Sequence, residues 1–242
     1  MQQVFWELTG PESTRGLAEW DDSVKLEGPI YCSANPGHRH AGKRLTDLSV
    51  LLTSRRIPDF VWTWSSNCLI QDHVLRLFHE QGFSGYEVKP VKARMKVRAK
   101  EPDPCDDNPG LRAEVAAKIE IPTLWELVVT GWAGMAPPES GVRLIESCPA
   151  CGLKGYSCFT DPSRLIDESQ WDGSDFFIVW PLPNFIFVSA RVARFIRRSR
   201  LLGAHLKQPS KLRCEGILRG GRLSYRMPEP RARELGEPLG IY

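Results

Sequence analysis

The chain has 242 residues, of which 42% are hydrophobic and 10% aromatic, and this is enough apolar material for a folded core. A formal net charge of +3 is too small for overall charge to indicate nucleic-acid binding. No apolar run approaches the roughly 18 residues of a membrane span, and the first residues lack the pattern of a signal peptide. We therefore expect a soluble cytoplasmic protein without membrane contact.

The first hundred residues predict two strands with a helix between them. Phe60–Trp64 and Tyr86–Arg98 are rich in aromatic and β-branched residues, which favour strands. Between them, apolar residues recur at the spacing of one helix face. This helix is predicted to begin at a capping residue, Ser66 or Asn67, and to end at Gly82.

The second part of the chain predicts three strands and another helix. The strands are Leu124–Thr130, Phe176–Trp180 and Phe185–Val188, and the helix runs from Ser189 to Gly203 with several arginines on its surface. The segment 213–242 is rich in Gly, Pro and Arg without periodicity, so we predict an irregular tail.

Two segments, about 28–100 and 144–212, match in the order and spacing of their residues. In each, 27 residues separate a cysteine from an aspartate before a strand, and 11 residues separate a helical valine from a glycine. These residues are Cys32, Asp59, Val74 and Gly85 in the first segment, and Cys148, Asp175, Val192 and Gly203 in the second. We interpret residues 1–242 as a single domain with an internal pseudo-repeat.

The chain has seven cysteines, an odd number without the density of a disulfide scaffold, so we expect reduced thiols and a metal. The stretch Cys148-Pro149-Ala150-Cys151-Gly152 has the spacing of a zinc knuckle. Such a turn supplies two of the four ligands that Zn²⁺ holds in a tetrahedron, and its glycine tolerates the required backbone conformation. A redox pair would stand between a strand and a long helix, which the sequence does not predict here.

The second half of the zinc site is predicted near Cys32, which the repeat matches to the first knuckle cysteine. Asn35 stands where the second knuckle cysteine would be. His38 and His40 follow a Pro-Gly turn, and either can complete the site. Cys158 is a further alternative ligand. The predicted fold is therefore α+β with two similar halves, each a knuckle turn followed by strands and a helix packed on a sheet, joined by a shared zinc site.

No catalytic motif is present. The sequence lacks His-Glu-x-x-His, the zinc-deaminase signature, the phosphate-binding glycine loops and Gly-x-Ser-x-Gly. His73 and His79 are six residues apart and do not share a helix face, so we interpret them as surface residues. We expect the zinc to be structural and the protein not to be an enzyme.

A basic stripe is predicted on one face of the strand near residue 90. Lys92, Arg94, Lys96 and Arg98 alternate with apolar residues, so they share a face that could meet an acidic partner or nucleic acid. A plain solvated sheet face is the alternative. Aromatic residues, which stack on bases, are absent from the stripe, so nucleic acid is the less favoured partner.

The sequence resembles the double-CxxCG motif proteins of myxobacteria and their relatives, which are associated with immunity to polymorphic toxins. The matching stretches are Gly28–Cys32 with Leu45–Ser49, Gly82–Val91, Cys148–Gly152 and Asp175–Pro181. One departure is that Cys32 with His38 or His40 replaces the family's first Cys-x-x-Cys-Gly. The resemblance implies a protein that binds and neutralises one cognate toxin. A zinc-ribbon protein that binds nucleic acid is the alternative function.

Overall fold

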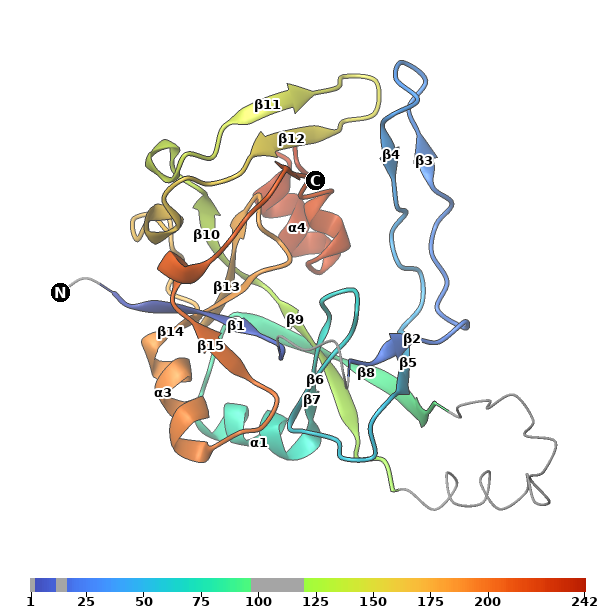
Figure 1. Ribbon diagram of the computed structural model, residues 1–242, viewed down its shortest axis with the longest axis vertical. Coiled ribbons are helices and arrows are strands. Elements are labelled where there is room, and N and C mark those ends of the chain that lie inside the picture. Colours follow the sequence, from blue (N-terminus) through green and yellow to red (C-terminus); the bar gives the residue numbers. More distant parts are fainter. Residues whose placement is uncertain (1–2, 12–16, 97–119) are drawn as a thin grey trace.

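The computed structural model describes residues 3–11, 17–96 and 120–242, and within these ranges the fold is mixed α+β (Figure 1). The coarse prediction of an α+β fold is thus confirmed. The helices are α1 (Asp72–Glu80), α3 (Ala190–Ser199) and α4 (Glu229–Gly236). Short 3₁₀ turns occur at Pro138–Ser140, Pro162–Arg164, Pro209–Lys211 and Leu223–Tyr225.

Two large sheets form the body of the protein. The six-stranded sheet has the spatial order β2 (Glu19–Trp20), β5 (Leu48–Leu52), β8 (Tyr86–Met95), β9 (Leu124–Val129), β7 (Cys68–Gln71), β6 (Phe60–Trp62). The five-stranded sheet has the order β10 (Gly131–Met135), β13 (Phe176–Trp180), β14 (Ile186–Ser189), β1 (Phe5–Thr9), β15 (His205–Lys207). All strand pairs are antiparallel except β5 with β8 and β10 with β13.

Two smaller sheets lie at one end of the molecule (Figure 1). The hairpin of β3 (Ile30–Tyr31) and β4 (Arg39–His40) stands apart from the body. The other small sheet consists of β11 (Leu144–Ser147), β12 (Lys154–Ser157) and β16 (Ile217–Leu218). The turns of the β3–β4 and β11–β12 hairpins lie side by side, which is where the metal centre was predicted.

Four strands of each large sheet have the same order and register. The order β6-β7-β9-β8 in one sheet matches β13-β14-β1-β15 in the other, with every neighbour antiparallel. Glu126 lies between Leu69 and Lys89, and Glu7 lies in the same way between Phe187 and Lys207. In the chain, β1 comes before β6, β7 and β8 but lies in the five-stranded sheet. In the same way, β9 comes before β13, β14 and β15 but lies in the six-stranded sheet.

The contacts between the two sheets are also reciprocal. Phe176 N donates to Ser84 O at 3.0 Å, and Phe60 N donates to Leu202 O at 2.9 Å. The segment after α1 therefore contacts β13 of the five-stranded sheet, and the segment after α3 contacts β6 of the six-stranded sheet.

The glycines of these crossing segments leave no room for a side chain. A Cβ on Gly85 would lie 2.1 Å from Phe176 O, and one on Gly203 would lie 2.2 Å from Phe60 O. Both glycines have positive φ angles, of 85° and 82°, a region that favours glycine. Only glycine fits at either crossing without a shift of the backbone.

The two predicted helices differ in how they begin. α3 begins where its sequence indicates, because the Ser189 side chain accepts a hydrogen bond from Val192 N. The prediction that α1 begins at Ser66 or Asn67 is wrong, since Cys68–Gln71 forms β7 and the helix begins at Asp72. These residues form a strand and not a helix because Cys68, Leu69 and Ile70 are buried in succession inside the sheet, where β7 pairs with β6 and β9.

The predicted irregular tail is partly ordered. Residues after 213 contain β16 and α4, and Leu223, Met227, Ala232 and Ile241 are buried. Pro230 at the start of α4 suits a first turn, and Arg233 forms ion pairs with Glu229 and Glu237, each four residues away. A short helix with this much charge has a weak apolar period, which is why its sequence did not predict it.

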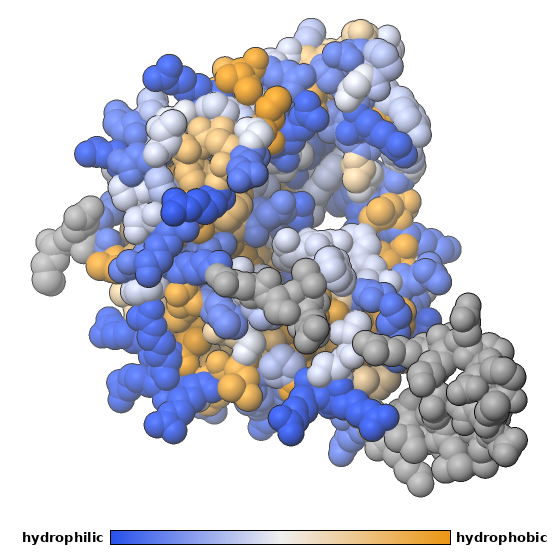
Figure 2. All heavy atoms as spheres, viewed as in Figure 1, coloured by the Kyte–Doolittle hydropathy of each residue, from blue (hydrophilic) through white to orange (hydrophobic). Residues whose placement is uncertain are grey.

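Aromatic side chains fill the space between the sheets and the helices. Phe78 of α1 is fully buried and contacts Phe176 of one sheet and Phe60 of the other, with ring centroids 5.3 and 6.2 Å apart. Burial of each such side chain contributes about 1.5–3 kcal/mol. This core forms a cluster separate from the buried residues Cys32, Cys148 and Leu153. The outer surface over α3 is largely hydrophilic (Figure 2).

Candidate metal centre

Two hairpin turns, far apart in the chain, bring four metal-binding side chains together. Cys32, His38, Cys148 and Cys151 each place a ligand atom within 4.8 Å of all the others. Cys32, His38 and Cys148 are buried and Cys151 is half-buried. This group could bind a metal ion.

The distances fit a tetrahedral zinc ion. With Zn–S bonds of about 2.3 Å and Zn–N bonds of about 2.0 Å, tetrahedral geometry places sulfur atoms roughly 3.8 Å apart and sulfur and nitrogen roughly 3.5 Å apart. Sγ of Cys32 lies 3.6 Å from Sγ of Cys148, and Sγ of Cys151 lies 3.7 Å from Nδ1 of His38. These two distances are close to those of a tetrahedral ligand set, and all four atoms lie within 4.8 Å of one another.

The second turn has the backbone of a knuckle. Cys148 N donates to Leu153 O at 2.9 Å, and Gly152 N donates to Cys148 O at 2.8 Å. Gly152 has a φ of 71°, which accounts for a glycine after the second cysteine. Hydrogen bonds, first from the Cys151 backbone and then from His38 and Ala150, lower the pKa of Cys148 to about 6 despite its desolvation. The turn therefore favours the thiolate form that binds metal.

The first turn is one residue longer and uses a different second ligand. Cys32 N donates to His38 O at 3.2 Å, and these residues are six positions apart. The matching hydrogen bond of the second turn, from Cys148 N to Leu153 O, joins residues five positions apart. Asn35, which the repeat matches to Cys151, instead accepts at its backbone oxygen a hydrogen bond from His38 N at 3.0 Å. The imidazole of His38 is long enough to reach the sulfurs from the far end of the turn.

A carboxylate fixes the orientation of the His38 ring. His38 Nε2 lies 2.7 Å from Oε1 of Glu146, and Oε2 of Glu146 lies 3.2 Å from Nη2 of Arg219. Although desolvation favours the neutral acid, hydrogen bonds from Arg219 and His38 keep the pKa of Glu146 below its usual value. In the neutral ring whose Nε2 donates to this carboxylate, Nδ1 carries the lone pair and can bind a metal, the arrangement of many metal-binding histidines.

His40, the alternative to His38, lies outside the group. Its Nε2 is buried and has no hydrogen-bond partner among the described residues. Desolvation, together with Arg222, His38 and Arg219, lowers the pKa of His40 and keeps the ring neutral. The structure thus brings His38 and not His40 to the three cysteines.

Cys158, the other alternative ligand, forms a disulfide with Cys214, and the Cα atoms are 5.6 Å apart. The expectation that the cysteines are reduced is therefore wrong for this pair. The bond joins the segment after β12 to the segment before β16. The two cysteines are 56 residues apart, so no local sequence pattern indicates that they pair. Cys68 is buried as a free thiol, and desolvation raises its pKa.

The predicted basic stripe is only partly open to a partner. Arg94 Nε lies 2.6 Å from Oδ2 of Asp21, and Lys96 Nζ lies 2.6 Å from Oε2 of Glu19. Lys92 is exposed, and Arg98 lies outside the described residues. The acidic residues come from β2 and the turn after it, which pack beside the stripe through β5.

Glu146 and Arg219 are the functional residues that the sequence did not indicate. Glu146 lies in β11 and stands two residues before Cys148, which directly follows the strand. In an extended chain, residues two apart lie on the same face. The local pattern contains this signal for Glu146. For Arg219 there is no such signal, because β16 joins the small sheet from a distant part of the chain.

Comparison with known proteins finds no matching family model and no matching curated protein. Within the described part of the chain, no helix has the length and apolar content of a membrane span. The likeness to double-CxxCG proteins therefore rests on the sequence motifs alone and stays a prediction.

Proposed function

We propose that Cys32, His38, Cys148 and Cys151 hold one structural Zn²⁺. Three sulfurs and one imidazole nitrogen form the soft, tetrahedral ligand set that zinc favours in proteins. Protein ligands fill all four positions, so no place is left for the water that a catalytic zinc would need. The single observation that carries this proposal is the spacing of the four ligand atoms, all within 4.8 Å.

In this proposal the zinc joins two similar halves. The equal order and register of β6-β7-β9-β8 and β13-β14-β1-β15 supports an internal duplication in which the halves exchange their third strands. The sequences of these strands agree, with Trp6-Glu7-Leu8 in β1 and Trp125-Glu126-Leu127 in β9. Each half then contributes one knuckle to a single metal centre.

We infer that the protein is an immunity protein, not an enzyme, that binds and neutralises a cognate toxin in the cytoplasm. The support is the resemblance to double-CxxCG proteins, together with a closed Cys₃His group where that family has its paired motifs. A disulfide is uncommon in cytoplasmic proteins, so the redox state of Cys158 and Cys214 in cells bears directly on the location.

Coexpression with the product of the neighbouring gene tests this function. The wild-type protein should restore growth and form a complex with that product. A Cys148→Ser variant, which weakens the metal site, should protect less, while Lys25→Ala on the exposed surface serves as a control. Absence of both rescue and complex would rule the function out.

Nucleic-acid binding is the second candidate because α3 carries four arginines and no acidic residue. It predicts that affinity for a DNA duplex falls steeply as salt rises, since bound phosphates release counterions. Absence of binding at low salt would exclude it.

A further inference from the structure

Helix α3 has a row of positively charged side chains that do not stabilise the helix. Arg194 and Arg198 are four residues apart and both are exposed, and Arg197 follows Arg194 at three residues. Like charges at these spacings destabilise a helix by about 0.2–0.5 kcal/mol per pair. The helix contains no acidic residue that would offset this repulsion.

One arginine of α3 has a clear structural role. Arg191 forms an ion pair with Asp175 at 3.3 Å, and its Nη2 donates to Gln81 O and Gly82 O at the end of α1. Its guanidinium also lies 4.7 Å from the centre of the Phe83 ring. Arg191 therefore fastens α3 to α1 and Asp175, and we do not count it in the surface described next.

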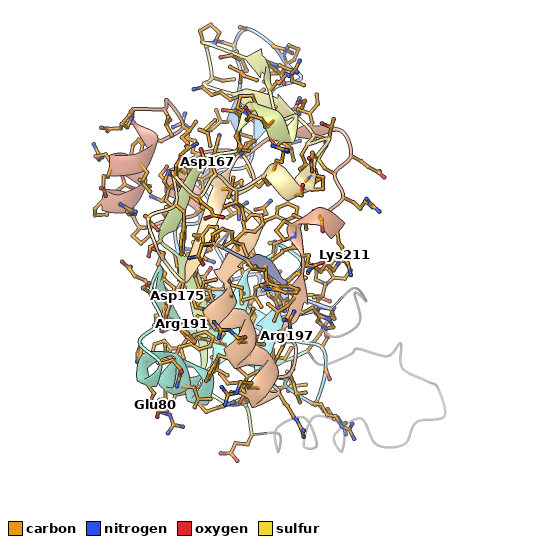
Figure 3. All side chains as sticks on the ribbon, turned by 90° about the vertical axis from the view of Figure 1, so that its left-hand side faces the viewer. Glu80, Asp167, Asp175, Arg191, Arg197 and Lys211 are labelled. Atoms are coloured by element: carbon orange, nitrogen blue, oxygen red, sulfur yellow. A yellow bond between two sulfur atoms is a disulfide. The ribbon has the colours of Figure 1, made fainter. Side chains whose placement is uncertain are left out.

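The remaining arginines contact no carboxylate among the described residues. The guanidinium of Arg197 lies over the Trp6 ring at 3.8 Å from its centre, which holds the charge in place without neutralising it. Arg194 donates only to Ala190 O, within its own helix, at 3.3 Å. Figure 3 shows Arg197 on the side of α3 that faces Lys211.

This surface extends into a hollow next to α3. The hollow has a volume of about 490 Å³ and is lined by Trp6, Leu206, Lys207, Gln208 and Lys211. Lys211 is exposed at its rim. We call Arg194, Arg197, Arg198 and Lys211 the α3 face.

We propose that the α3 face binds an acidic surface of a partner protein. Its fixed positive charges attract carboxylates, and Arg197 keeps unused N–H donors in the geometry that carboxylates accept. Among the described members of the β8 stripe, Arg94 and Lys96 are paired with Asp21 and Glu19, and Lys92 alone forms no ion pair with a described residue. The α3 face thus offers more unneutralised charge than the stripe. This inference rests on the proposed immunity function only for the identity of the partner.

The features of the face favour protein over nucleic acid. Trp6 is covered by Arg197 and is not free to stack on a base. Figure 3 shows Asp167 above α3 and Glu80 beside it on α1, and these acids would repel a phosphate backbone that continued past the face. A compact acidic patch on a protein can meet the face without touching either acid.

The test uses the full-length protein and three probes: a fluorescent 20-residue polyglutamate peptide, a DNA duplex, and the product of the neighbouring gene. The variant is Arg194→Glu with Arg198→Glu. The control, Lys25→Glu with Arg55→Glu, makes the same change in net charge on other exposed residues. We expect the double α3 variant to bind polyglutamate at least about tenfold more weakly than wild type at low salt, and the control to bind within about twofold of wild type.

Each outcome decides the proposal. Equal weakening in both variants would overturn it, because binding would then depend on net charge and not on the α3 face. Absence of polyglutamate binding by the wild type would overturn it too, because the face would then not attract carboxylates. Tighter binding of DNA than of polyglutamate, lost in the α3 variant, would overturn it in favour of nucleic acid. Selective loss of polyglutamate binding without any complex with the neighbouring product would support the α3 face and contradict the immunity function.

Discussion

Sγ of Cys32 and Sγ of Cys148 lie 3.6 Å apart, although 116 residues separate them in the chain. This contact requires the β3–β4 hairpin to meet the β11–β12 hairpin, which belongs to the other half of the sequence. A metal ion between the sulfurs would fasten the two hairpins to each other.

Replacement of His38 tests the assignment of the fourth ligand. His38→Ala should lose the metal and lower the thermal midpoint, by roughly 10 °C if about 3–4 kcal/mol of stability is lost. His40→Ala is the matched control and should keep the metal, since His40 lies outside the ligand group. Metal analysis of the purified proteins and a thermal melt give both values. Metal loss in the His40 variant and retention in the His38 variant would reverse the assignment.

Glu146→Gln should weaken zinc binding about 10–100-fold without abolishing it. The amide keeps the size of the side chain but accepts more weakly from His38 Nε2, so it orients the ring less well. Competition with a coloured zinc chelator measures this affinity. An affinity equal to that of the wild type would show that the carboxylate does not support the ligand.

The metal centre shows where sequence reasoning reaches its limit. Cys148 and Cys151 lie in one turn, so their spacing alone predicts a pair of ligands. The choice of His38 over His40 depends on which ring lies next to the cysteines of the other hairpin, and no local pattern contains that information. The disulfide of Cys158 was missed for the same reason, because it joins segments that only the folded chain brings together.

Strands that form long apolar or aromatic runs were predicted, whereas the order of the strands in the sheets was not. Phe176–Trp180 was predicted with its observed bounds because it is continuously apolar and ends at Pro181. α4 was missed because charged residues dominate it. The exchange of β1 and β9 between sheets was also missed, although the shared Trp-Glu-Leu of both strands is a usable signal in the sequence.

The two crossing glycines should respond alike to substitution. Gly85→Ala and Gly203→Ala should each destabilise the protein by about 2 kcal/mol or more, because a Cβ meets a backbone oxygen and the positive φ alone costs about 1–2 kcal/mol. Gly173→Ala is the control, since Gly173 has a φ of 85° and nothing within 4 Å of an added Cβ. Urea unfolding of the three variants gives the comparison. A cost at Gly203 no greater than at Gly173 would argue against a close crossing there.

Removal of the disulfide should lower stability without affecting the metal. Cys158→Ser with Cys214→Ser frees a loop closed across 56 residues, and the entropic model gives a cost of up to about 4 kcal/mol. Chemical unfolding measures the cost, and metal analysis should show an unchanged zinc content. Loss of zinc in this double variant would place Cys158 or Cys214 in the metal site.

The most direct test of the proposed structural zinc site is the mass of the intact protein measured under native conditions, before and after chelation. We predict a mass excess of one zinc ion per chain that is absent from the Cys148→Ser variant. We also predict that Cys32, Cys148 and Cys151 resist alkylation until the metal is removed. A native mass without metal, with these three cysteines readily alkylated in the folded protein, would contradict the proposed zinc site.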